Sequence, residues 1–169
     1  PSILVVKIPS EYNHVPIRVS DSFSETSSAT NSPPFFNVIN ISPSSISLKS
    51  IDLPDSITTI AELAFYNCDS FKSVTVPKNV KKLSTMAFAG CDSLEEVVLS
   101  EGIEFIDYRA FSDCLSLKKI NIPDSVKTIG NYAFAGCNLL TSIQIPDSVT
   151  SIEHSAFEDC SSITSIIIP

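Results

Sequence analysis

The sequence lacks the features that mark several common classes of function. Basic residues are few, with 11 Lys and Arg against 19 Asp and Glu, which gives a net charge of -8. This charge disfavours binding to phosphate backbones and to anionic lipid surfaces, so we expect no nucleic-acid partner. No apolar run approaches the roughly 20 residues needed to span a bilayer, so we expect no direct membrane insertion within this segment.

Residues for metal or catalytic chemistry are also scarce. The sequence has no C-x-x-C pair, and its two histidines, His14 and His154, lie far apart. It therefore shows no set of zinc ligands with the usual spacing. His154 stands beside Glu153 and Ser155, but these residues are consecutive and lack a strand-turn-helix elbow or an oxyanion signature. We therefore expect no catalytic residue, no metal and no cofactor.

What the chain does contain is a repeat of 23 residues. Five tandem units occupy residues 54–169 and begin at positions 54, 77, 100, 123 and 146. A fixed period in this range is the signature of a solenoid, in which each coil contacts only its neighbours. Every unit carries an Ala-Phe pair followed three residues later by a cysteine: Ala64-Phe65 and Cys68, Ala87-Phe88 and Cys91, Ala110-Phe111 and Cys114, Ala133-Phe134 and Cys137, Ala156-Phe157 and Cys160.

Each unit reads as a strand, a turn and a second turn. Alternating apolar residues such as Val74 and Val76 predict a β-strand, and the proline that follows in four of the five repeats ends the pairing because it cannot donate a hydrogen bond. A V-x-x-I step then predicts a turn that buries two aliphatic residues. The Ala-Phe segment predicts a short helical turn closed by a residue able to adopt a left-handed conformation. These closing residues are Asn67, Gly90, Asp113, Gly136 and Asp159.

The cysteines are predicted to be buried free thiols. Equivalent residues on adjacent coils lie about 4.8 Å apart with parallel side chains, so their Cβ atoms stay beyond the usual disulfide separation. Their odd number would also leave one unpaired. We interpret them as small hydrophobic residues of the core and not as bridges or metal ligands.

Residues 1–53 depart from the repeat. The strand-and-proline pattern occurs at 3–9 and again at 48–54, but the intervening stretch has neither the Ala-Phe pair nor the cysteine. We expect degenerate coils or a cap, with a Ser/Thr-rich loop or mobile insertion over 20–34. Terminal units of repeat arrays are usually atypical, so Phe35, Phe36, Ile39 and Ile41 are predicted to cover the first full repeat.

Two surfaces are candidate sites for a partner. On the turn side, aromatic and arginine residues replace the smaller or polar residues of other repeats, and such residues are enriched at interface hot spots. These residues are Phe105, Tyr108, Arg109 and Tyr132. On the sheet side, the alternative site comprises Glu96, Val98 and Asn121. Either surface has a simpler interpretation, in which the aromatic side chains lie flat on the coil and the sheet face is solvated with modest cross-strand charge pairing.

The pattern P-x-x-V-x-x-I-x-x-x-A-F-x-x-C-x-x-L-x-x-I-x-I-P over residues 48–169 resembles the BspA-like leucine-rich repeat of bacterial and parasitic-protist surface proteins. The resemblance implies a right-handed leucine-rich repeat solenoid, with a parallel β-sheet on one face and short helical turns on the other. It also implies a cell-surface or secreted adhesin that binds host matrix or cell-surface proteins. The alternative is an intracellular structural or scaffolding repeat docked in a larger assembly. The sequon Asn40-Ile41-Ser42 favours an extracellular location, but the motif is too short to decide between the two.

Both ends of the chain carry expectations of their own. Neither an initiator methionine nor a signal-like segment stands at Pro1, so any targeting signal is expected to have been removed or to lie outside this segment. The chain stops at Pro169, at a repeat boundary, without a polar closing unit. An uncapped coil leaves strand edges and an apolar face open, so we expect further repeats, a partner or end-to-end self-association to cover it.

Overall fold

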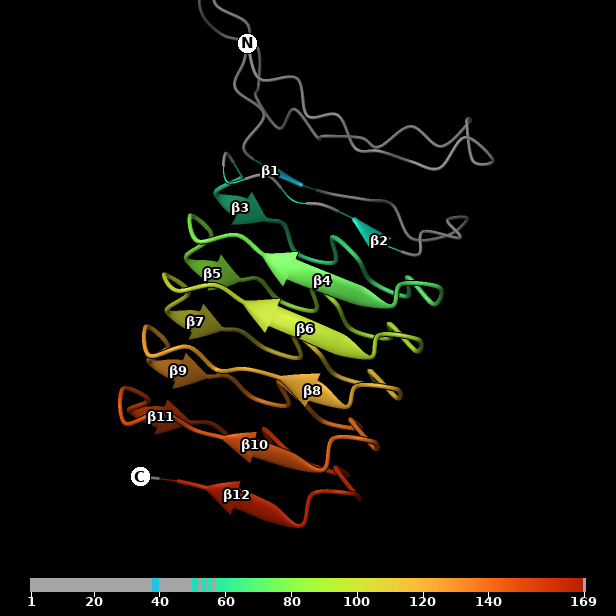
Figure 1. Cartoon of the computed structure of the whole chain (residues 1–169), viewed down its shortest axis with the longest axis vertical. Coiled ribbons are helices and arrows are strands. Elements are labelled where there is room, and N and C mark those ends of the chain that lie inside the picture. Colours follow the sequence, from blue (N-terminus) through green and yellow to red (C-terminus); the bar gives the residue numbers. More distant parts are fainter. Residues whose placement is uncertain (1–37, 40–49, 52, 54, 56, 169) are drawn as a thin grey trace, which may run out of the picture.

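The computed structural model shows a stack of similar coils that runs from β1 to β12 (Figure 1). It describes residues 38–39, 50–51, 53, 55 and 57–168. The loop predicted at 20–34, together with Phe35, Phe36 and Ile41, lies outside the described residues.

The predicted strand of each repeat forms one face of the stack, called here the main sheet. Its strands pair in parallel with a register of one repeat, so that Ser73 pairs with Glu96 and Glu96 with Lys119. Ser100 stands where other repeats have proline, and its N–H donates to the Val76 carbonyl at 3.2 Å. The main sheet comprises β2 (Ser50–Ile51), β4 (Ser73–Val76), β6 (Glu96–Leu99) and β8 (Lys119–Ile120), and the pair β10 (Ser142–Gln144) and β12 (Ser165–Ile167) continues its column.

A second parallel sheet, which the sequence did not predict, runs along the opposite side of the stack. The V-x-x-I step was predicted to be only a turn, but its second aliphatic residue, such as Leu83 or Ile106, lies in a two-residue strand. Two residues are too short for an alternating pattern to be visible in sequence. The second sheet comprises β1 (Val38–Ile39), β3 (Thr59–Ile60), β5 (Lys82–Leu83), β7 (Phe105–Ile106), β9 (Thr128–Ile129) and β11 (Ser151–Ile152).

The predicted helical turns are wrong: the residues that the structure describes contain no helix. The Ala-Phe segment is a run of tight turns in which alternate N–H groups have different partners. The Tyr66 N–H donates to the Leu63 carbonyl of its own coil at 3.1 Å, whereas the Phe65 N–H donates to the Ala87 carbonyl of the next coil at 2.8 Å. A helix would direct its N–H groups to carbonyls of its own coil, so bonding between coils prevents it here.

Each of these turn segments contains two residues with positive φ. The predicted closing residues confirm the expectation, with φ of 55° at Asn67 and 71° at Gly90. A second left-handed position lies four residues earlier, with φ between 53° and 59°, and sequence analysis missed it. It is occupied by Leu63, Met86, Arg109, Tyr132 and Ser155, which share no preference for this conformation.

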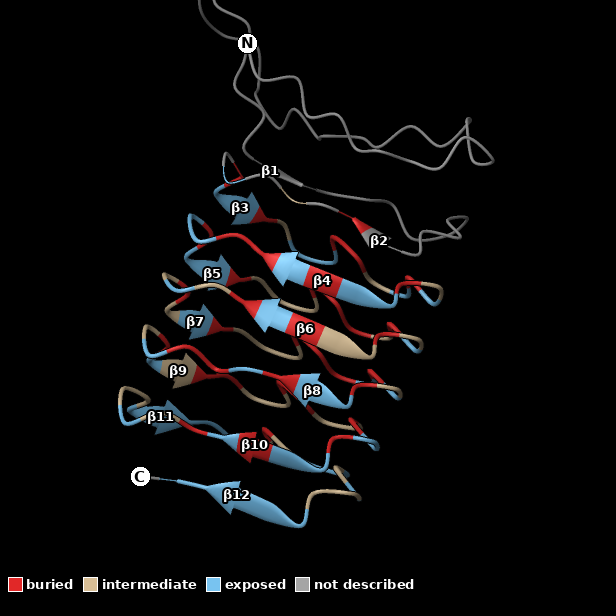
Figure 2. Cartoon of the chain, viewed as in Figure 1, coloured by how far each residue is buried: buried red, intermediate tan, exposed pale blue. Residues whose placement is uncertain are grey.

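The core lies between the two sheets and the turns (Figure 2). Its central feature is the Phe column, in which one ring from each coil stacks nearly parallel on the next. The ring centroids of Phe88 and Phe111 are 5.3 Å apart, and those of Phe111 and Phe134 are 5.5 Å apart. Fully burying each such side chain contributes roughly 1.5–3 kcal/mol, and stacking adds to that. The column comprises Phe65, Phe88, Phe111, Phe134 and Phe157.

The cysteines form a second column and are free, as predicted. The structure adds a hydrogen bond that sequence did not reveal: the Cys114 Sγ donates to the Phe88 carbonyl at 3.2 Å, and the Cys91 Sγ to the Phe65 carbonyl at 3.0 Å. Burial, with the nearby Asp69 charge adding to it, raises the pKa of the Cys68 thiol to about 11. This shift keeps the Cys68 thiol protonated at neutral pH, which lowers its reactivity while the chain is folded.

The last described coil is the most open part of the core. Ile143 is 3% exposed, whereas Ile166, its register partner one coil later, is 36% exposed. Phe157 is likewise only half-buried, although Phe111 and Phe134 are fully buried. Side chains of this coil have a neighbouring coil on one side only within the described residues.

We predict that the Phe column dominates stability. Phe111→Ala removes a fully buried ring between two stacked neighbours and should lower the free energy of unfolding by about 3–5 kcal/mol. Phe105→Ala is the matched control, because Phe105 is 43% exposed, and should cost less than about 1 kcal/mol. Chemical denaturation followed by circular dichroism measures both. Equal losses would show that the column is not the main source of packing energy.

We also predict that all five thiols are free. Alkylation of the unreduced chain in denaturant should label five cysteines by mass spectrometry. In native buffer Cys160 should react first, since it is the only half-buried thiol among the described cysteines. A labelled count below five, or a native reaction that starts at Cys114, would contradict this picture.

Candidate interaction surface

The structure brings together three of the four turn-side residues named from the sequence and adds a fourth. Tyr108 and Arg109 follow β7, and Tyr132 follows β9 one coil later. His154 follows β11 in the third coil. Because coils stack in register, these short segments lie above one another. The four side chains, Tyr108, Arg109, Tyr132 and His154, are called the Tyr108 cluster below.

Ring contacts hold the Tyr108 cluster together. The Arg109 guanidinium carbon lies 5.4 Å from the centre of the Tyr108 ring and 5.1 Å from that of Tyr132, within cation–π range. The two tyrosine rings meet edge to face at 6.2 Å, and Tyr132 meets His154 in the same way at 5.7 Å. These contacts fix the orientation of the guanidinium.

Arg109 has unused hydrogen-bonding capacity. Its Nε is buried and has no hydrogen-bond partner in the described part of the chain. Buried polar groups are almost always paired, so an unpaired guanidinium nitrogen marks an unusual site. The backbone also holds Arg109 at a φ of 53°, in the left-handed region. Backbone and rings together hold the guanidinium in one place on the turn side.

Phe105 lies apart from the cluster. It is in β7 of the second sheet, between Lys82 and Thr128 in register, and is 43% exposed. Among the described aromatic residues, no ring contact joins it to the cluster. Phe105 was predicted to belong with Tyr108 because both are aromatic, and His154 was weighed only as a catalytic residue. His154 lies two repeats after Tyr108 in the sequence, and this shared repeat position is the signal that predicts its place in the cluster.

Of the sheet-side candidates, Glu96 and Val98 lie in β6 and Asn121 directly follows β8, and two of the three are engaged within the chain. Glu96 binds Lys119 at 2.7 Å across β6 and β8. The Asn121 amide accepts from the Leu99 N–H and donates to the Leu99 carbonyl, both at 2.8 Å. Val98 projects outward and is 42% exposed. Exposed ion pairs contribute little to stability, so these contacts mainly order the face.

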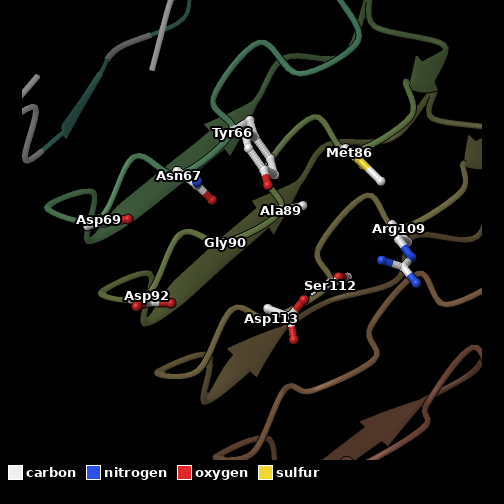
Figure 3. A pocket seen from close by; sticks show the side chains of 10 residues that line it. All are labelled: Tyr66, Asn67, Asp69, Met86, Ala89, Gly90, Asp92, Arg109, Ser112 and Asp113. Carbon is white, nitrogen blue, oxygen red and sulfur yellow. Dashed lines mark hydrogen bonds between the residues drawn. The ribbon is translucent and has the colours of Figure 1, made fainter. Parts of the chain in front are cut away.

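A groove of about 340 Å³ lies on the turn side next to Arg109 (Figure 3). Its floor contains Ala89 and Gly90, whose small size leaves the hollow. A Cβ at Gly90 would overlap the Asn67 amide oxygen, so a larger residue there would require the Asn67 side chain to move. Met86 and Arg109 lie on one side of the groove, Asp69 and Asp92 lie on the other, and Asp113 lies between them.

The carboxylates of the groove crowd one another. Burial, with the charges of Asp69 and Asp113 adding to it, raises the pKa of Asp92. The Ser112 hydroxyl donates to Asp113 at 2.8 Å. Within the described residues, no group of three His, Cys, Asp or Glu side chains is arranged to hold a metal ion. The same residues provide no long apolar helix that could cross a bilayer.

Comparison with known proteins gives a family and several structural relatives. The family model for the BspA type leucine-rich repeat region matches six copies over residues 43–139 and 104–169. A leucine-rich repeat protein of T. pallidum is 31% identical, with a TM-score of 0.72 over 80% of this chain and 66% of that one. One from Eubacterium ventriosum is 36% identical, with a TM-score of 0.64 over 70% of this chain and 32% of that one.

A leucine-rich cell surface protein of Faecalibacterium prausnitzii shares the fold at 24% identity, with a TM-score of 0.59 over 73% of this chain and 42% of that one. This chain thus spans at most 66% of the length of these three relatives. No curated protein matches it significantly. The repeat pattern, the parallel solenoid and the family match agree: the chain belongs to the BspA-type leucine-rich repeat family, a class of protein-interaction repeat modules.

Proposed function

We propose that this chain is the non-enzymatic recognition module of a surface adhesin, and that it binds a host matrix or cell-surface protein through the Tyr108 cluster. The observation that carries this proposal is the Arg109 guanidinium, which is held between two tyrosine rings and has a buried Nε without a partner. Stacked repeats present such residues on an extended surface, which suits binding to a protein.

The chemistry of the cluster favours protein recognition. Tyrosine and arginine are the residues most enriched at binding hot spots, where they supply large contact area together with hydrogen bonds. Ring contacts already restrict Arg109, Tyr132 and His154, so little side-chain freedom remains to be lost on binding. This ordering before contact supports a tight and specific interface.

The sheet face is a weaker candidate for the same function. Glu96 is paired with Lys119, and Asn121 is committed to the Leu99 backbone, so a partner would have to displace these contacts. Val98 remains available, but a single exposed valine offers little area. The turn side therefore has more polar side chains without a partner in the chain than the sheet side has.

The proposal predicts that removing both tyrosines abolishes capture of the partner. The double variant Tyr108→Ala with Tyr132→Ala should weaken binding by about 2 kcal/mol or more, roughly thirtyfold in Kd, because it removes two hot-spot rings. Binding is measured on immobilised fibronectin, laminin and collagen and on host cells. The melting temperature of the variant should stay close to that of the parent chain.

Two control variants define the site. Phe105→Ala removes an exposed aromatic ring away from the cluster and should leave binding unchanged. The triple change of Glu96, Val98 and Asn121 to alanine tests the sheet face. Loss of binding in the triple variant but not in the double variant would move the site to the main sheet. Absence of binding to every matrix protein and cell would reject adhesion.

A further inference from the structure

We infer that the groove beside Arg109 is a binding site for one basic side chain, lysine or arginine, of the protein partner. The inference rests on the proposed function in that it places a protein on this turn face. The groove's carboxylate wall would bind the cationic head, and Arg109 would donate to a backbone carbonyl of the same partner segment.

The carboxylates of the groove have no counter-charge within the described residues. In the described part of the chain, the ion pairs leave Asp69, Asp92 and Asp113 without a cation. Asp107, by contrast, is paired with Lys82 at 2.7 Å. A cationic group entering the groove would relieve the mutual repulsion of these carboxylates and would form charge-assisted hydrogen bonds with them.

Arg109 lines the other side of the groove. Figure 3 shows the guanidinium on the side of the groove opposite Asp69 and Asp92, with Asp113 below the floor between them. Its positive charge opposes a cation at that end, and its side chain forms no ion pair among the described residues. The groove therefore carries opposite charges on its two sides. A peptide segment matches this polarity, because its lysine or arginine supplies the cation and its carbonyl supplies the acceptor.

The lining of the groove also contains apolar groups. Tyr66, Met86 and Ala89 add apolar surface beside the charged side chains. Lysine and arginine place a hydrophobic stem on such surfaces while the charged head stays near water or a counter-ion. The net charge of -8 would also attract a basic partner and raise its rate of association.

The experiment is an NMR titration of the labelled chain with Nα-acetyl-lysine methylamide, with Nα-acetyl-norleucine methylamide as the matched uncharged probe. The lysine probe should shift the amide signals of Ala89, Gly90 and Asp92, and added salt should weaken its binding. Equal shifts with the norleucine probe, shifts that map to the main sheet, or no shifts at all would overturn the inference.

Variants test the carboxylates directly. Asp92→Asn with Asp113→Asn should weaken the lysine probe about tenfold, the value expected for loss of a charge-assisted hydrogen bond. Asparagine tolerates the left-handed backbone at position 113 and still accepts from Ser112. Asp124→Asn with Asp147→Asn is the matched control, since it removes two exposed carboxylates in other coils and should leave binding unchanged. Equal weakening by both pairs of substitutions would show that the effect comes from the net charge of the chain and would overturn the proposed site.

The inference and the proposed function fail separately. Lysine-probe binding in a chain that captures no matrix or cell protein would support the groove and reject adhesion. Capture that survives Asp92→Asn with Asp113→Asn, but is lost with the tyrosine double variant, would support the Tyr108 cluster and overturn the groove as part of the interface.

Discussion

Hydrogen bonding between coils is the constraint on which the rest of the structure depends. Each coil is bonded through its backbone to both of its neighbours at a nearly constant interval. The Phe111 N–H donates to the Ala133 carbonyl of the next coil at 2.8 Å, and the Gly130 N–H donates to the Ile106 carbonyl of the preceding coil at 2.8 Å. This bonding sets the parallel register of both sheets. It also determines that like side chains stack, so that the Phe rings and the thiols form columns. A coil cannot shift without breaking several of these contacts together.

The same register makes departures from the repeat meaningful. In a stack of equivalent coils, a residue that differs from its column neighbours changes the surface at one known place. Arg109 and Tyr132 share a column with Leu63 and Met86, and Tyr108 shares one with His154. Their neighbours along the stack supply the rings that hold the guanidinium. The hollow beside it exists because Ala89 and Gly90 are small where the first coil has Tyr66 and Asn67.

The two faces of the solenoid use their polar residues differently. On the main sheet, Glu95 lies between Lys118 at 2.9 Å and Lys72 at 3.9 Å, and Asn121 bridges two coils through the Leu99 backbone. On the turn side, one cation and three carboxylates line the same groove without being neutralised as ion pairs among the described residues. Unused charge and donor capacity is what a partner can exploit, which is why we place recognition on the turns.

The repeat interval alone determined the architecture. Five returns of Ala, Phe and Cys at one spacing predicted stacked coils, a buried Phe column, free thiols and left-handed closing residues, because identical coils in register can bury these residues only against one another. The tertiary structure alone decided the second sheet, the tight turns in place of helices, and the union of Tyr108, Arg109 and His154. These features depend on which N–H groups bond to the next coil and on how side chains from different repeats meet, and neither is encoded by local propensity within one repeat.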